Sequence, residues 1–112
     1  DIVWIDGLAE PWAPPFFAVG ARGFTSGLIN VWPEHSVAIH AALEQNNYAR
    51  ARQLIDLMSG FEEIRAEEQN GTNVTVVKAA LALIGEGCGR HGEGALHEAS
   101  PTVASARPIW WR

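Results

Sequence analysis

The first third of the chain carries two short apolar runs separated by a proline-rich segment, and this order constrains the fold most. Residues 2–5 form a continuous apolar run typical of a strand buried on both faces, and Asp6-Gly7 ends it with turn residues. Residues 11–19 suit a short, irregular helix, and residues 24–31 are predicted to form a second strand. A strand, a crossover helix and a second strand indicate a parallel βαβ unit. Since two parallel strands cannot cover both of their apolar faces, we expect the remaining strands to lie outside this sequence.

Three helices are predicted to follow. Pro33 can occupy the first position of a helix over residues 34–45. Residues 48–68 carry the longest apolar stripe, and Asn73 can cap a last helix that stops at Gly85 and Gly87. The predicted core-facing positions are Val37, Ala38, Ala41 and Ala42 in the first helix, Tyr48, Ala51, Leu54, Met58, Phe61 and Ile64 in the second, and Val74, Val77, Leu81 and Ile84 in the third. Residues 91–112 show no sustained period and are predicted to be an irregular tail.

Composition narrows the classes of function. The 112 residues carry a formal net charge of −5, which argues against a nucleic-acid surface and against a polybasic membrane anchor. No apolar run approaches the length of a transmembrane helix, and a single cysteine favours a reducing, cytoplasmic location. The only methionine is Met58, and the chain opens directly into an apolar run. We therefore expect this sequence to be part of a longer protein.

Three blocks of sequence resemble one enzyme family. Residues 23–31, Gly-Phe-Thr-Ser-Gly-Leu-Ile-Asn-Val, followed by Pro33, look like the eighth strand of the dihydrodipicolinate synthase / N-acetylneuraminate lyase family. Residues 47–51, Asn-Tyr-Ala-Arg-Ala, and residues 73–78, Asn-Val-Thr-Val-Val-Lys, resemble the starts of two of its C-terminal helices. The resemblance covers about residues 2–90. Val74 departs from the family's proline, and the tail departs from the family's ending.

The resemblance implies the fold class and the parent's activity. The expected fold is α/β, the C-terminal fragment of a (β/α)8 barrel: residues 1–45 would supply strands seven and eight with their helices, and residues 46–90 a helical extension. The parent would be a class I aldolase-type lyase, a homo-oligomer that needs no cofactor. It would form a Schiff base between a lysine and pyruvate, a related 2-keto acid or a sugar acid, with a tyrosine relaying protons. Lys78 and Tyr48, the sole lysine and tyrosine, fall on predicted helices rather than at strand ends, so no catalytic residue is assigned here.

The resemblance also points to substrate-binding residues at the C-terminal ends of the two strands, where barrels of this kind place their sites. Thr25 and Ser26 offer hydroxyls to a keto-acid carboxylate, and Gly27 would let a ligand approach the backbone. Gly7 and Glu10 follow the seventh strand, where relatives contact the variable end of the substrate. The alternatives are that the two hydroxyls only pair within the barrel, and that Glu10 is a solvated surface residue.

The histidines and the cysteine do not indicate a metal site. His35 and His40 are five residues apart, which does not place them on one helical face, and Cys88 has no ligand at metal spacing, so we predict no metal site. A second hypothesis makes residues 33–84 a non-enzymatic helical interaction module. It would be favoured if the first thirty residues had no structure. Under the barrel hypothesis the isolated chain should expose apolar strand edges and self-associate, which light scattering would detect.

Overall fold

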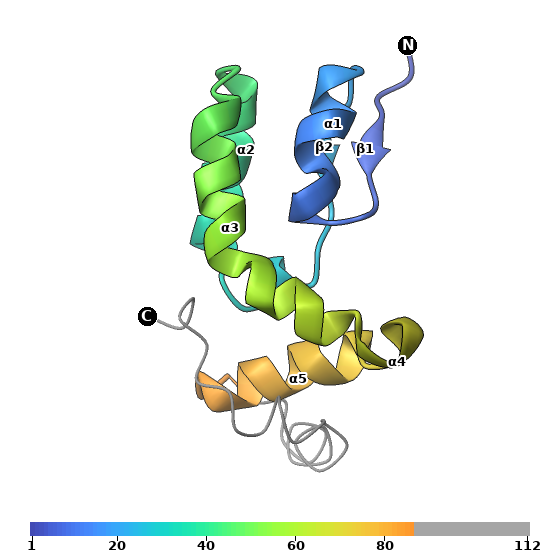
Figure 1. The fold of residues 1–112 in the computed structure, drawn as a ribbon, viewed down its shortest axis with the longest axis vertical. Helices are drawn as coiled ribbons and strands as arrows, with labels where there is room; N and C mark the ends of the chain where they lie inside the picture. Colours follow the sequence, from blue (N-terminus) through green and yellow to red (C-terminus); the bar gives the residue numbers. More distant parts are fainter. Residues whose placement is uncertain (87–112) are drawn as a thin grey trace. The chain divides into compact units, whose positions relative to one another are not determined.

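A computed structural model describes residues 1–86 of the chain (Figure 1). It divides the chain into two compact units, residues 1–59 and residues 60–112, of which 60–86 are described in the second. The described residues do not include Gly87, Cys88 or the predicted tail of residues 91–112. None of the helices within residues 1–86 combines the length and apolarity needed to cross a membrane.

The first unit opens with the predicted parallel βαβ arrangement. Strand β1 (Ile5–Asp6) pairs in parallel with strand β2 (Gly23–Phe24), with Ile5 opposite Gly23 and Asp6 opposite Phe24. Between them run a 3-10 turn, η1 (Glu10–Trp12), and helix α1 (Ala13–Ala18), which contacts both strands. The first turns of both elements hold prolines, where the missing N–H is tolerated. The predicted order of elements is thus confirmed.

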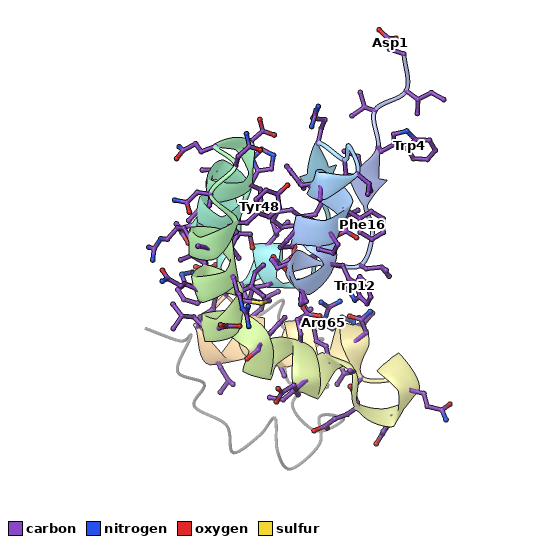
Figure 2. All side chains as sticks on the ribbon, turned by 45° about the horizontal axis from the view of Figure 1, so that its top comes forward. Asp1, Trp4, Trp12, Phe16, Tyr48 and Arg65 are labelled. Atoms are coloured by element: carbon purple, nitrogen blue, oxygen red, sulfur yellow. The ribbon has the colours of Figure 1, made fainter. Side chains whose placement is uncertain are left out.

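The first strand is shorter and more exposed than its sequence predicts. Ile2, Val3 and Trp4 precede β1, and all three side chains are exposed, as is Ile5. Figure 2 shows Trp4 projecting away from the ribbon. The expectation of burial on both faces is therefore wrong for the chain as it stands, because β2 is the one strand that pairs with β1 in the described residues. Apolar side chains and an open strand edge remain uncovered here.

The prediction of a second strand over residues 24–31 is also wrong for most of that range. Pairing ends at Phe24, and residues Leu28–Asn30 form a 3-10 turn, η2. The cause is local hydrogen bonding. The Ile29 amide donates to Ser26 Oγ at 3.3 Å, and the Asn30 side chain donates to the Gly27 carbonyl at 3.3 Å. Short polar side chains of this kind compete with the sheet for backbone groups and turn the chain out of it.

Helix α2 (Pro33–Glu44) begins at the predicted proline, but its buried face differs from the prediction. Val37, Ala38 and Ala41 are exposed. The buried positions are His35, Ser36, Ile39, Ala42 and Leu43, which recur at three- and four-residue spacing. Two polar residues therefore occupy core positions where apolarity alone favoured the neighbouring face. His35 Nε2 donates to the Leu54 carbonyl of helix α3 at 2.6 Å and fixes α2 against α3.

Helix α3 (Tyr48–Arg65) carries the predicted stripe: Ala51, Leu54, Met58 and Phe61 are buried. In the second unit, α4 (Glu67–Asn70) is a turn rather than a regular helix, because Glu68 and Gln69 adopt left-handed backbone angles. The Thr72 hydroxyl donates to the carbonyl of Ile64 at 3.0 Å and so satisfies a group at the end of α3.

Helix α5 (Asn73–Leu83) starts at the predicted asparagine, although Thr72 rather than Asn73 is its N-cap residue. Its buried positions are Val76, Ala79 and Ala80, whereas Val74 and Ile84 of the predicted stripe are exposed. Arg65 is held at the start of α5 by bonds to the Asn73 side chain, and it contacts Glu62 at 2.5 Å (Figure 2). The helix ends at Leu83, and Gly85 follows it with a φ of 81°, the predicted left-handed stop.

Candidate functional site

The candidate site lies at the C-terminal ends of the two parallel strands. The Thr25 amide donates to the Asp6 carbonyl at 2.9 Å, one residue beyond the paired positions, and so keeps the two chain segments together past the strands. Each segment then turns away, the first into η1 and the second into η2 (Figure 1). Parallel strands bring their C-terminal ends to one edge of a sheet, and the loops that follow them share that edge.

Glu10 is the centre of the site. Its side chain is 0% exposed, although it stands at the first position of η1 in a loop region. Its Oε1 atom accepts a hydrogen bond from Ser26 Oγ at 2.6 Å and a second from Ser36 Oγ, also at 2.6 Å. These distances are typical of hydroxyl groups that donate to a carboxylate. The segment before η2 and helix α2 therefore each place a hydroxyl on the same carboxylate oxygen of Glu10.

The second oxygen of Glu10 has no partner among residues 1–86. Oε2 is buried, and no hydrogen bond reaches it from the described residues. A buried acceptor without a donor costs about 1–3 kcal/mol, and more when it carries charge. The carboxylate is thus held firmly by one oxygen, while its other oxygen can still accept a donor.

Asp6 is a second buried carboxylate at the same edge. It ends β1, is 0% exposed, and its Oδ1 accepts the Leu8 amide at 2.7 Å in a local turn. Its Oδ2 is buried and lacks a partner within residues 1–86. Burial raises the pKa of Asp6 above its ordinary value, and the hydrogen bond from Leu8 opposes this in part.

The backbone between these two acids is unusual. Ala9 has a φ of 70° and a ψ of −173°, a conformation that is nearly restricted to glycine. Ala9 is itself buried, and its carbonyl accepts the Trp12 amide at 3.2 Å. The strained backbone at Ala9 directs the chain so that Glu10 enters the interior instead of solvent.

The structure brings two of the five predicted site residues into direct side-chain contact, Ser26 and Glu10. Thr25 is exposed and joins the site through its backbone bond to Asp6. Gly27 is half-buried, and its carbonyl accepts bonds from Asn30. Gly7 is exposed, and a Cβ atom there would meet nothing within 4 Å.

Sequence reasoning missed Ser36 and took Asp6 only as a turn residue. Ser36 is 2% exposed and also lines a pocket of about 270 Å³ together with β2, Ile29 and the face of α2 that carries Pro33, Val37 and His40. The sequence of α2 gives no clear signal for Ser36, because alanine and valine occur on several faces of this helix. Nothing in the sequence marks Asp6 as buried.

The described residues around Ser26 do not have the arrangement of a serine nucleophile. A serine nucleophile needs a base that takes its proton, usually a histidine. His35 Nε2 bonds to the Leu54 carbonyl, and His40 Nε2 lies 3.1 Å from the Arg22 carbonyl, so both rings are engaged away from Ser26. Lys78 is exposed on α5 and does not stand at a strand end. Among residues 1–86, no group of three or more potential ligands could hold a metal ion.

Comparisons with known proteins find related enzymes. The chain is 36% identical over 89 residues to a 4-hydroxy-tetrahydrodipicolinate synthase from Corynebacterium urealyticum, covering 80% of this chain and 28% of the relative. It is 28% identical over 91 residues to a probable 5-dehydro-4-deoxyglucarate dehydratase from Xanthomonas campestris, covering 79% of this chain and 30% of the relative. No family model matches the chain.

Solved structures of the same kind of enzyme are similar to this chain. A dihydrodipicolinate synthase from Oceanobacillus iheyensis superimposes with a TM-score of 0.72 at 36% identity, covering 87% of this chain and 36% of that one. A dihydrodipicolinate synthase from Bacillus clausii gives 0.74 at 32% identity, covering 87% and 38%. The chain therefore spans about a third of the length of these relatives, and over most of its own length it shares their fold.

Proposed function

This chain is related to the dihydrodipicolinate synthase / N-acetylneuraminate lyase family and matches about a third of the length of its members. From that relationship we propose that it is the portion of a Schiff-base lyase that binds the substrate but does not carry the reacting amine. In this proposal β1 and β2 are the seventh and eighth strands of a (β/α)8 barrel. Residues 1–45 complete the barrel, and residues 46–90 extend it. The substrate is pyruvate or a related 2-keto acid.

The observation that carries the proposal is the bond between Ser26 and Glu10. It joins the loop after β1 to the loop after β2, at the edge where a barrel of this kind binds its substrate. Pockets for small molecules hold a few fixed polar groups among apolar walls, and a serine–carboxylate pair is such a group. Glu10, Ser26 and the neighbouring Thr25, Gly27 and Gly7 are the proposed substrate-binding residues.

The chemistry of the pair favours a substrate with hydroxyl groups. A keto-acid carboxylate would be repelled by Glu10, so Glu10 faces the end of the substrate away from that carboxylate. There its Oε2 atom, which lacks a donor, can accept a hydroxyl once the side chains that cover it shift. One relative is named a probable 5-dehydro-4-deoxyglucarate dehydratase, and this keto acid carries hydroxyls between its keto group and a second carboxylate.

The exposed side chains at the start of β1 and before it support the part of the proposal that places another barrel strand beside β1. Ile2, Val3, Trp4 and Ile5 present an apolar surface beside an open strand edge. A preceding barrel strand would pair with that edge and cover those side chains. The pairing of β1 with β2 gives the first thirty residues a defined structure, which favours the barrel over a helical interaction module.

Borohydride trapping tests the function. The full-length protein is incubated with pyruvate, the imine is reduced to a stable secondary amine, and peptides are analysed by mass spectrometry. We expect one adduct per subunit, on a lysine outside these 112 residues, with Lys78 unmodified because it is exposed on α5 and not desolvated. No adduct, or an adduct on Lys78 alone, would contradict the proposed function.

A further inference from the structure

The hydroxyl of Ser36 is used in an uncommon way. Serine hydroxyls inside helices usually bond to a carbonyl one turn earlier on the same helix. Ser36 instead donates from α2 to Glu10 Oε1, a residue 26 positions away in sequence. Its side chain is almost fully buried, so this bond is made out of contact with water.

The two serines together fix the orientation of the carboxylate. A carboxylate oxygen offers two lone pairs, and Ser26 and Ser36 occupy both of those on Oε1. Turning the plane of the carboxylate away from this position would break both bonds and leave both hydroxyls without their acceptor. Oε2 is consequently the one oxygen of Glu10 that is available to another donor.

The two donors differ in rigidity. Ser26 belongs to the turn before η2, is only partly buried and also accepts the Ile29 amide. Ser36 stands in the first turn of a twelve-residue helix that starts with a proline and is fixed to α3 by the neighbouring His35. Of the two, Ser36 is the better anchor, because its backbone cannot follow a movement of the loops.

We propose that Ser36 is a positioning residue of the substrate site, which acts through Glu10 and sets the selectivity for substrates that carry a hydroxyl at the end opposite the keto acid. This inference rests on the proposed function. It assigns to helix α2, which lies outside the strand ends, control over the position from which the second oxygen of Glu10 meets the ligand.

The test compares two ligands on the full-length protein by calorimetry: pyruvate, which has no hydroxyl for Glu10, and 2-dehydro-3-deoxygluconate, a keto acid whose far end carries hydroxyls and no second carboxylate. The variants are Ser36→Ala, Ser36→Thr, Glu10→Gln and, as a matched control, Ser59→Ala on an exposed position of α3. In Ser36→Ala we expect the Kd of the hydroxylated acid to rise about tenfold, the effect of losing one bond to a charged group. The Kd of pyruvate should stay unchanged.

Ser36→Thr retains the hydroxyl at a position that lines the pocket beside α2, so this variant should keep the parent's affinity. Ser59→Ala should have no effect. If Ser36→Ala weakened both ligands equally, or if Ser36→Thr failed to retain affinity while remaining folded, Ser36 would be merely structural and the inference would be overturned.

Glu10→Gln separates the two proposals. If it weakens the hydroxylated acid while Ser36→Ala does not, the positioning role of Ser36 is wrong and the proposed substrate site stands. If Glu10→Gln leaves both affinities unchanged, or if the parent binds neither ligand, the proposed site is wrong and the role of Ser36 falls with it.

Discussion

At the scale of single residues, the site is dominated by buried acids whose hydrogen bonding is incomplete. Glu10 and Asp6 each keep one oxygen without a partner within the described residues. Such groups reduce the stability of the folded state unless something outside the described chain meets them. Each of these oxygens can accept a hydrogen bond from a donor outside the described residues.

Asp6 gives a prediction with a definite sign. Because burial raises its pKa above the ordinary 3.8, the folded state holds the proton to a higher pH than the unfolded chain does. Between those two pKa values the folded state binds more protons, so the free energy of unfolding falls as the pH rises through this window, and the loss is complete above it. Asp6→Asn keeps the acceptor for the Leu8 amide and removes the charge.

We therefore expect Asp6→Asn to be more stable than the parent at pH 7 and to differ from it much less near pH 3. Urea denaturation at both pH values measures this. Asp56→Asn, at an exposed position of α3, is the control and should change little. Equal stabilisation of Asp6→Asn at both pH values would argue against a proton-linked effect.

Sequence reasoning found part of the residue-scale picture. The resemblance pointed to Ser26 and Glu10, and the structure places them 2.6 Å apart. Ser36 escaped because a serine near a helix start is ordinarily a surface residue. Its burial depends on which face of α2 turns inward, and that is decided by packing against distant elements.

At the scale of elements, the strained start of η1 determines how Glu10 enters the interior. Ala9 adopts backbone angles that cost an alanine about 1–3 kcal/mol. Glycine adopts them without strain, although it also gains conformational freedom in the unfolded state. The persistence of this strain indicates that the surrounding contacts determine the path of the loop.

Ala9→Gly should accordingly raise the free energy of unfolding by about 1 kcal/mol. This is the strain that is relieved, less the cost of the greater conformational freedom of glycine in the unfolded chain. Ala38→Gly is the matched control, since Ala38 lies at an exposed position of α2 with ordinary helical geometry and should lose about 1 kcal/mol. Thermal denaturation distinguishes the two. Destabilisation of both variants by the same amount would show that Ala9 is not strained.

The sequence predicted the helices from the spacing of apolar residues and from the proline, asparagine and glycine residues at their ends. It did not predict the buried faces of two of them. On α2 and α5, alanine and valine occur on several faces, so the apolar pattern alone did not single out the buried one. On α3 the larger side chains Leu54, Met58 and Phe61 lie on one stripe, and there the prediction is confirmed. The second strand failed because Ser26 and Asn30 satisfy backbone groups locally.

At the scale of the whole molecule, the sequence predicted a parallel βαβ unit that is incomplete by itself, and the parallel pair with its uncovered apolar side chains agrees with that. The relatives are about three times as long as this chain, and their solved structures match it over 87% of its residues. The substrate site proposed here would thus be shared between this chain and strands outside it.

The central claim is that a keto acid binds where β1 and β2 end. Hydrogen–deuterium exchange of the full-length protein with and without a saturating keto acid that carries hydroxyls, 2-dehydro-3-deoxygluconate, tests it most directly. We predict slower exchange in peptides that cover residues 6–10 and 25–30, and unchanged exchange across α5. Unchanged exchange at both strand ends, or protection confined to α3 and α5, would contradict the claim.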